Sequence, residues 1–503
     1  MKTKGSVRTY SSPFEWEFLE KRSDALLICI PIILLLAITI PFIARGYWED
    51  EIFSITTSRT WSGMLGIFRN YENNMSLYYV ALHIWMQFFG ETELATHSLS
   101  LLFAVLSIPV FFKLERNWMN KSSALLGGLL LVANPLFAYY AIESRSYSFL
   151  ILSATVSTLI FIRLMRKPGY ILAICYGLSI TAGIYIHYFG ILLPLVHALS
   201  IYWKKLTRLQ IRSFLLSGLL VLVGLLPLLL FPPQNKSQID WIIKPDILHL
   251  WYTIKDLFGG VFVILVLIIC LYFILRKGYR EDVTNEGYSL SRLSIFWTIV
   301  PACLLFLFSW LVKPAFLTRF FVWCLPGAVL LTCLIVGYTG WSHVRKSVIW
   351  VLVLVFLLIR SYGILRIKGS GYQEAVQYLN ERIQPGESVL AYPFYKSIHT
   401  RFYLEKLASP KPFAIPFVIT RLPFLPGGGG RDPDPDMDTL KKLVADNGKV
   451  YLLCRGDSSN IDSIQNRTWL PEIQRIIFAR HPKLRDTVFG VGTEQPVRVI
   501  VYE

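Results

Sequence analysis

The fold follows from the stretch between Asp24 and Glu51, which reads DALLICIPIILLLAITIPFIARGYWEDE. Residues 25–44 carry no charged side chain, and a helix that crosses a bilayer needs about 20 mainly apolar residues. The run is too long for a signal peptide, and no small-residue cleavage site follows it. We therefore expect a retained membrane span that ends shortly before three adjacent carboxylates, Glu49–Glu51.

Apolar runs of this length recur along the chain of 503 residues. Hydrophobic residues make up 54% and charged residues 17% of the sequence, whereas a soluble chain is typically about 25% charged. A soluble enzyme, a disordered chain and a fibrous repeat are thereby excluded. The expected fold class is a polytopic α-helical membrane protein with about eleven transmembrane helices. Their expected positions are 24–44, 97–114, 123–141, 146–164, 169–187, 189–203, 213–231, 259–275, 293–312, 320–340 and 347–364.

Two shorter apolar stretches lie in the first outer loop. Trp61–Phe68 carries its apolar residues at helical spacing, and Leu77–Phe89 is too short to cross a bilayer. We expect both to form helices that lie along the membrane surface. Counting Leu77–Phe89 as a span would reverse the side of every later loop.

The distribution of charge predicts the topology. The net charge of +17 comes from 50 Lys and Arg against 33 Asp and Glu. With a cytoplasmic N-terminus, the inner loops hold more than twice as many basic residues as the outer loops, as the positive-inside rule requires. The bias accounts for most of the basic excess, so nucleic acid is not an expected partner. The expected location is the cell (inner) membrane, with the lipid bilayer on all sides of the spans.

The composition changes after residue 364, where proline, glycine and charged residues return. We expect a transmembrane domain over 1–364 and an extracytoplasmic α/β domain over 365–503. The cysteines are scattered without CxxC spacing, which favours neither a disulfide framework nor a zinc site. The elements expected in the second domain are helices at Tyr372–Ile383 and near Met437–Asp446, strands at Ser388–Tyr392, Val450–Cys454 and Val497–Tyr502, a turn at Pro385-Gly386 and a loop over Gly427–Asp436.

Polar residues gather at the outer ends of the predicted spans. Each has an ordinary structural explanation: Glu49–Glu51 as an acidic loop start in water, Arg145 and Arg319 as interface anchors, and His187 as a satisfied histidine at a span end. Together, however, carboxylates, arginines and a histidine from loops far apart in sequence converge on one face. The loops are Trp48–Glu51, Glu143–Tyr147, His187-Tyr188 and Lys313–Arg319.

This set of residues suits the transfer of a sugar from a lipid phosphate. A carboxylate would take the proton of the attacking hydroxyl, and arginines would hold the phosphate that leaves. No nucleotide-binding loop is needed, and the sequence contains neither GxxxxGK[ST] nor a strand-borne GxGxxG.

Four segments also resemble a known family. They are Trp48-Glu-Asp-Glu-Ile-Phe-Ser54, Asn74-Met-Ser-Leu-Tyr-Tyr79 leading to Phe89-Gly90, Tyr139-Tyr-Ala-Ile-Glu-Ser-Arg-Ser-Tyr147 and Tyr185-Ile-His-Tyr-Phe189, with weaker matches at Arg319-Phe320 and Gln373–Glu387. In combination and in this order they resemble the type C glycosyltransferases, specifically the bacterial branch related to protein O-mannosyltransferases and the lipid A aminoarabinose transferase. Asn74–Ser76 stand where the family has His-Pro-Pro.

The resemblance implies a role for each matching residue. Asp50 would be the catalytic base, with Glu51 as its partner. Arg145 and Arg319 would hold the phosphate from two sides. The remaining residues implied to contact donor or acceptor are Tyr78, Tyr79, Glu143, Tyr147, His187 and Tyr188.

The resemblance also implies the reactants. The donor would be a polyprenyl-phosphate-linked sugar, and the reaction would invert the anomeric centre. The acceptor hydroxyl could belong to a lipid, a polysaccharide or a protein. No cofactor is required; some distant relatives hold a divalent metal at the acidic motif, which is not expected at Asp50.

Two other classes of function compete with this interpretation. A transporter or flippase of lipid-linked glycans should carry ionisable residues near the middle of its spans and broken or repeated helices, whereas the spans here are nearly free of charge. A receptor whose outer domain binds a ligand would not need eleven spans. The loop between Pro232 and Gly259 is expected to be a mobile lid or a lipid contact, or simply part of an interfacial aromatic belt.

Overall fold

The computed structural model describes residues 16–234, 239–240, 242–277, 287–384, 387–392, 397–407, 437–446, 449–455, 470–493 and 495–502. The chain divides into two compact units. The membrane unit contains residues 1–43, 57–233 and 242–365, and the α/β unit contains residues 44–56, 234–241 and 366–503. The acidic segment Glu49–Glu51 therefore belongs to the same unit as the C-terminal residues.

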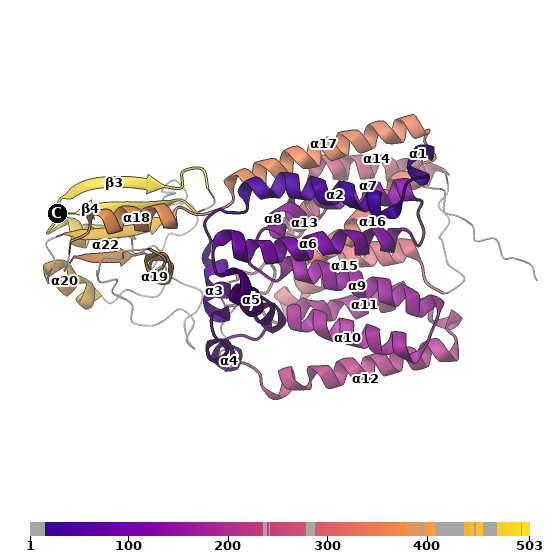
Figure 1. Cartoon of the computed structure of the whole chain (residues 1–503), viewed down its shortest axis with the longest axis horizontal. Helices are drawn as coiled ribbons and strands as arrows, with labels where there is room; N and C mark the ends of the chain where they lie inside the picture. The colour runs from indigo at the N-terminus through magenta and orange to yellow at the C-terminus, as the bar shows by residue number, and fades with distance from the viewer. Residues whose placement is uncertain are drawn as a thin grey trace, which may run out of the picture. The chain divides into compact units, whose positions relative to one another are not determined.

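The membrane unit is built from helices (Figure 1). Its first part contains α1 (Glu17–Glu20), α2 (Asp24–Thr39), η1 (Ile40–Phe42), α4 (Trp61–Asn70), α5 (Ser76–Phe89), α6 (Glu93–Glu115), α7 (Lys121–Ala133), α8 (Pro135–Ala141) and α9 (Tyr147–Arg166). Its second part contains α10 (Tyr170–Ile186), η2 (Tyr188–Ile191), α11 (Leu192–Ser200), η3 (Trp203–Lys205), α12 (Arg208–Leu230), α13 (Ile247–Leu257), α14 (Val261–Lys277), α15 (Leu290–Leu311), η4 (Thr318–Cys324) and α16 (Leu325–Tyr338). Helix α3 (Glu49–Ser58) and helix α17 (His343–Ile367) each run across a boundary between the units.

The helices confirm a multi-pass membrane protein. Among the described residues, seven helices are long and apolar enough to cross a bilayer, or up to nine if each of two bent pairs is one span. Two further apolar helices, Tyr170–Ile186 and Tyr188–Ser200, are shorter. They occupy the fifth and sixth expected positions, so the count of eleven spans stays a prediction, as does the orientation of the termini.

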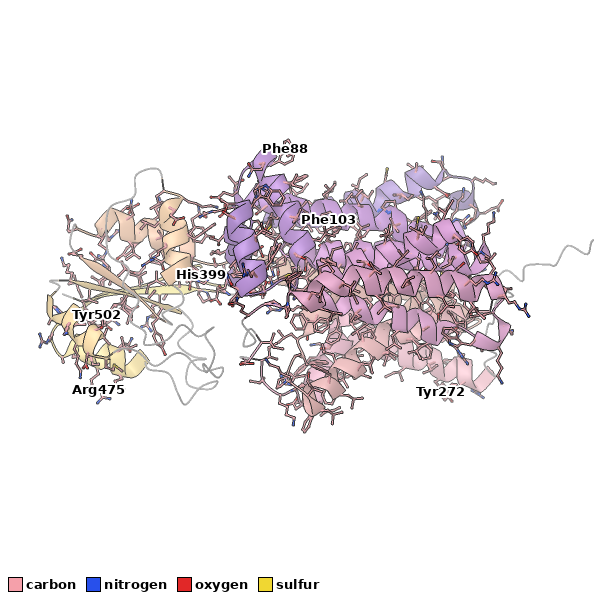
Figure 2. The ribbon with its side chains drawn as sticks, turned by 90° about the horizontal axis from the view of Figure 1, so that it is seen from below. Phe88, Phe103, Tyr272, His399, Arg475 and Tyr502 are labelled. Atoms are coloured by element: carbon pink, nitrogen blue, oxygen red, sulfur yellow. The ribbon has the colours of Figure 1, made fainter. Side chains whose placement is uncertain are left out.

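Burial separates the centre of the bundle from its lipid-facing rim. Nearly every side chain of α16 is buried, whereas α12 exposes apolar side chains such as Leu215 and Leu229 over most of its length. Helices that are apolar all round are typical of membrane spans. Aromatic stacking joins neighbouring helices, as between Phe103 on α6, labelled in Figure 2, and Phe149 on α9, whose ring centroids lie 4.0 Å apart.

Local sequence explains where the helices begin and bend. The Thr92 side chain caps α6 by accepting a hydrogen bond from Ala95 N–H, and Thr207 with Gln210 forms a capping box at α12. The α7–α8 pair bends by 66° at Asn134-Pro135. Pro135 cannot continue the hydrogen bonding of α7, and Asn134 caps α8 instead.

The two predicted surface helices are present as α4 and α5, and both lie at one end of the bundle (Figure 1). Helix α13 is also short, and it meets α14 at 83°. It occupies the segment expected to be a mobile lid or a lipid contact.

The α/β unit contains one four-stranded sheet with the order β1-β2-β4-β3 (Figure 1). Its strands are β1 (Ser388–Ala391), β2 (Val450–Arg455), β3 (Lys483–Phe489) and β4 (Val497–Tyr502). Strands β1 and β2 are parallel, and β4 is antiparallel to both β2 and β3. Its helices are α18 (Tyr372–Arg382), α19 (Ser397–Glu405), α20 (Met437–Asp446) and α22 (Leu470–Phe478).

Alternation along the strands produces two packed faces. Leu390, Leu452 and Ile500 face a core that includes residues of α20 and α22, and α18 packs against β3 and β4. Figure 2 shows Tyr502, which belongs to that core, and Arg475 on the exposed side of α22. The predicted strands and helices are confirmed here, while β3, α19 and α22 were not predicted. The turn at Pro385-Gly386 and the loop Gly427–Asp436 lie outside the described residues.

Candidate functional site

The turn between α8 and α9 holds Glu143, Arg145 and Tyr147. Helix α8 ends at Ala141 and α9 begins at Tyr147, so five residues reverse the chain. The turn closes through a hydrogen bond from Arg145 N–H to the Glu143 carbonyl, with 2.6 Å between nitrogen and oxygen. Glu143 is fully buried, and the Arg145 side chain is 8% exposed. Both residues therefore lie inside the protein and not on an open loop.

Two side chains of helix α6 hold this turn through hydrogen bonds. Ser100 donates its hydroxyl to the Glu143 carbonyl, and the Ser144 hydroxyl donates to Thr96 Oγ1 at 2.9 Å. Both α6 residues are themselves fully buried. A buried backbone carbonyl needs such a partner, so α6 determines the position of Glu143 and Arg145. The sequence analysis did not identify Thr96 or Ser100.

His187 lies at the junction of α10 and η2 and is 2% exposed. Its ring stacks on Phe189 with 5.1 Å between ring centroids, and it lies 5.4 Å from the Phe320 ring and 6.2 Å from the Tyr147 ring. These aromatic contacts bring together the α8–α9 turn, the α10–η2 junction and η4. The His187 junction lies 40 residues after Tyr147, and Phe320 on η4 follows 133 residues later.

Arg145 and Arg319 approach the same histidine. Both guanidinium groups lie close enough to act electrostatically on the His187 ring. Arg319 is half-buried on η4, and its guanidinium carbon lies 5.8 Å from the centroid of the Phe320 ring. Two positive charges from distant loops therefore lie near one buried histidine, whose ring packs among aromatic side chains. We call Arg145, His187 and Arg319 the cationic cluster.

Helix α13 fixes the loop that carries Arg319. The Thr253 and Thr318 hydroxyls are hydrogen-bonded with 3.0 Å between their oxygens. On the other side, Trp297 on α15 donates its indole N–H to the Trp323 carbonyl at 3.0 Å. Because η4 is held at both ends, Arg319 is placed by packed helices.

Tyr78 and Tyr79 on α5 are fully buried. The Tyr78 hydroxyl lies 3.5 Å from the Ser100 oxygen, next to the Glu143 turn. The Tyr79 hydroxyl donates to Glu72. These bonds give both tyrosines a structural role, and contact with a substrate stays a prediction for each.

Asn73 and Asn74 position Tyr188. Tyr188 donates its backbone N–H to Asn74 Oδ1 at 2.9 Å and its hydroxyl to Asn73 Oδ1. Ser76 donates to the Tyr185 carbonyl at 3.4 Å. The segment that departs from the family's His-Pro-Pro therefore holds the chain on either side of His187, a role that was not predicted.

Asp50 and Glu51 lie in the first turn of α3, in the α/β unit. Glu51 is 1% exposed, and its Oε2 accepts the Trp48 backbone N–H at 3.2 Å. This bond is one half of a capping box, so Glu51 stabilises the start of the helix. Asp50 is half-buried. Its approach to the cationic cluster stays a prediction, as does the partnership of Glu51 in catalysis.

The described residues contain no group of three His, Cys, Asp or Glu arranged as metal ligands. The prediction about a divalent metal at Asp50 is not tested by this observation.

Comparison with known proteins identifies the fold. No family model matches the sequence, and no curated protein matches it significantly. Among solved structures, the chain resembles ArnT from Cupriavidus metallidurans in the apo state with a TM-score of 0.61. The match covers 95% of this chain and 97% of ArnT at 13% sequence identity. The chain has the fold of the type C glycosyltransferases.

A second type C structure is similar over a smaller part of its own length. The oligosaccharyltransferase of Archaeoglobus fulgidus, in complex with Zn and sulfate, matches with a TM-score of 0.51 at 12% identity. The match covers 89% of this chain and 70% of the oligosaccharyltransferase. The predicted resemblance to the type C fold is therefore confirmed. At these identities the likeness concerns the fold, so activity is argued from the residues themselves.

Proposed function

We propose that the chain is a membrane glycosyltransferase. It moves a sugar from a polyprenyl-phosphate-linked donor to an acceptor hydroxyl at the outer face of the membrane and inverts the anomeric centre. The observation that carries the proposal is the cationic cluster: two arginines from distant loops beside a buried histidine, within the type C fold.

The cationic cluster is suited to a lipid phosphate. Each guanidinium presents a planar fork of donors that matches phosphate oxygens. Arg145 is almost fully buried and Arg319 half-buried, and charges in a water-poor site interact more strongly than charges in water. As the bond between the anomeric carbon and the phosphate oxygen breaks, negative charge grows on the phosphate, and the two arginines stabilise it.

Asp50 is the proposed general base. Its carboxylate takes the proton of the acceptor hydroxyl while the hydroxyl oxygen forms the new bond to the anomeric carbon. The phosphate leaves with the bonding electrons on the opposite face, which inverts the centre. Glu51 maintains the first turn of α3 by capping it. The base is thus carried on a helix start and not on an unstructured loop.

The fold supports the same class of reaction. One of the structures with a similar fold is the Archaeoglobus fulgidus oligosaccharyltransferase. The acceptor of this chain is not assigned by its residues: a lipid, a polysaccharide or a protein hydroxyl each fits the chemistry.

Transfer can be tested directly. Purified protein in nanodiscs is offered synthetic polyprenyl-phosphate sugars together with a crude envelope acceptor. Product formed by the wild type and lost in Asp50→Asn supports the proposal. Asp438→Asn, an exposed position on α20 in the same unit, is the control that should retain transfer. A wild type that transfers from no donor, yet moves the lipid-linked sugar between leaflets, would identify a transporter instead.

A further inference from the structure

The segment that leads into the acidic motif is held by the C-terminal part of the chain. Arg45, Gly46, Tyr47 and Trp48 precede α3 and lie within the same compact unit as residues 366–503. The contacts of this segment show how the start of α3 is positioned.

Both backbone polar groups of Tyr47 are bonded to side chains of the α/β unit. Tyr47 donates its N–H to the Tyr403 hydroxyl oxygen at 2.7 Å. The Ser370 hydroxyl donates to the Tyr47 carbonyl at 2.6 Å. Tyr403 lies on α19, the helix that also carries His399, labelled in Figure 2. Because Tyr47 is bonded through both its N–H and its C=O, its backbone cannot move away from Tyr403 and Ser370 without breaking a hydrogen bond.

Neighbouring residues strengthen this attachment. Arg45 donates through Nη1 to the carbonyls of Arg366 and Lys368, the latter at 2.8 Å. Gly46 comes so close that a Cβ atom there would lie 3.1 Å from the Ser370 carbonyl oxygen. An alanine at position 46 would therefore require the segment and the Ser370 backbone to move apart by a few tenths of an ångström.

The Tyr47 side chain is fully buried and packs against an aromatic ring and a lysine. Its ring meets the edge of the Phe402 ring, with 5.8 Å between centroids. The Lys406 ammonium lies 4.7 Å from the Tyr47 ring and 4.9 Å from the Phe402 ring. Cation–π contacts of this kind add to the stability of the attachment.

The attachment is transmitted to Asp50 through the helix start. Trp48 follows Tyr47 directly, and its carbonyl accepts the N–H groups of Glu51 and Ile52, at 3.1 Å each. Its own N–H is bonded to the Glu51 carboxylate. Tyr47 is held by its bonds to Tyr403 and Ser370. The first turn of α3 begins at the next residue but one, so its position depends on that of Tyr47. Asp50 belongs to that turn.

We infer that the α/β unit positions the catalytic helix, with Tyr403 and Ser370 as positioning residues for Asp50. The role of Asp50 in this inference rests on the proposed function. The attachment of residues 45–48 to the α/β unit rests only on the observed contacts. A general base must lie within hydrogen-bond reach of the proton that it takes. A misplacement of about 1 Å can cost about 100-fold in rate. Tyr403 and Ser370 thereby contribute to the reaction without touching either substrate.

Tyr403→Phe is the informative variant because it removes one hydroxyl and keeps the ring. Tyr378→Phe on α18 is the matched control: its hydroxyl is buried in the same unit but has no hydrogen-bond partner among the described residues. Ser370→Ala removes the second bond to Tyr47. Each full-length variant is compared with wild type by thermal melting, by hydrogen exchange of peptides covering residues 45–56, and by kcat and KM in the transfer assay.

We expect Tyr403→Phe to speed exchange in residues 45–56 and to lower kcat about tenfold or more, with the KM for the donor changed less than about twofold. Ser370→Ala should act in the same direction, and Tyr378→Phe should match the wild type. Unchanged exchange, or faster exchange with unchanged kcat, would overturn the inference. An equal loss of kcat in Tyr378→Phe would also overturn it, because the effect would then be general destabilisation.

The outcome separates this inference from the proposed function. A wild type that transfers no sugar contradicts the proposed function, and with it the catalytic role of the attachment. Faster exchange in Tyr403→Phe would still establish that the α/β unit holds the segment.

Discussion

Replacing Arg319 by alanine tests the phosphate-binding role of the cationic cluster. The side chain is half-buried on η4 and lies beside His187. The backbone of η4 is held independently by the Thr253–Thr318 and Trp297–Trp323 bonds. Truncation at Cβ should therefore leave the loop in place and remove only the guanidinium. Loss of activity can then be assigned to the missing charge and its donors.

The size of the effect follows from the bonds that the guanidinium would make. A hydrogen bond to a charged group contributes about 1.5–3 kcal/mol, and each 1.36 kcal/mol corresponds to a factor of ten in rate. One such bond to the departing phosphate predicts a loss of roughly 10- to 150-fold in kcat/KM. Two bonds from the planar fork would give a larger loss. Arg319→Lys should recover part of it, because lysine keeps the charge and loses the fork.

The assay measures initial rates of transfer at several donor concentrations, with protein reconstituted at equal density. Arg163→Ala is the control: it removes an arginine from the last turn of α9, about 24 Å along the helix from Tyr147 at 1.5 Å per residue. Arg145→Ala and the double variant complete a cycle. Because both arginines would hold one phosphate, their effects should not be additive.

The reasoning would be refuted by a particular pattern of results. If Arg319→Ala and Arg145→Ala both keep wild-type kcat/KM while the proteins melt normally, the phosphate is bound elsewhere. If Arg163→Ala loses as much activity as Arg319→Ala, the effect reflects general damage to the membrane unit.

Three further predictions concern the structure around the site and in the α/β unit. Asn74→Ala removes the acceptor for Tyr188 N–H, so the free energy of unfolding should fall by about 1 kcal/mol; an unchanged melting temperature would contradict that role. Gly127→Ala would place a Cβ 2.0 Å from Glu115 Oε1, so it should destabilise the membrane unit by about 1–3 kcal/mol, and Glu115→Ala in the same chain should restore stability. The Asp486 pKa is lowered from 3.8 to about 2 by hydrogen bonds from Arg498 and Lys483. That contribution to stability is complete above the unfolded pKa and is lost as pH falls from about 4 to about 2; the protection of β3 and β4 amides, relative to the intrinsic exchange rate at each pH, should fall over that range in the wild type and change less in Asp486→Asn.

The membrane helices were predictable because an apolar run of about 20 residues has few possible structures other than a membrane-spanning helix. The helix Met437–Asp446 was predicted with its observed bounds as α20, because its apolar residues recur at helical spacing. Strand β3 was not predicted, because its apolar residues do not recur at a regular spacing. It is an edge strand with the sequence KLRDTVF, exposed or half-buried at every position, so it shows no alternation of buried and polar residues.

The site residues were predicted from their chemistry, whereas the residues that bond to their loops were not predicted. Arg145, His187 and Arg319 are charged or titratable groups at span ends, which is a signal in the sequence. Ser100 and Asn74 are ordinary polar residues, 43 and 114 residues away from the groups they bond. Nothing in the local sequence shows such long-range hydrogen bonds.

The acidic motif illustrates a further limit of sequence reasoning. Adjacent carboxylates look equivalent in the sequence, yet Glu51 caps a helix and is 1% exposed, while Asp50 is half-buried. The three-dimensional structure distinguishes a helix cap from a candidate base, because the cap is defined by a hydrogen bond to Trp48.

Transfer of sugar by Asp50→Asn tests the account most directly. The substitution keeps the shape of the side chain and removes its ability to accept a proton as a carboxylate. With a synthetic polyprenyl-phosphate sugar and an envelope acceptor, the account predicts product from the wild type and none above background from Asp50→Asn, at equal expression and equal melting temperature. Substantial turnover by Asp50→Asn would contradict the assignment of the base.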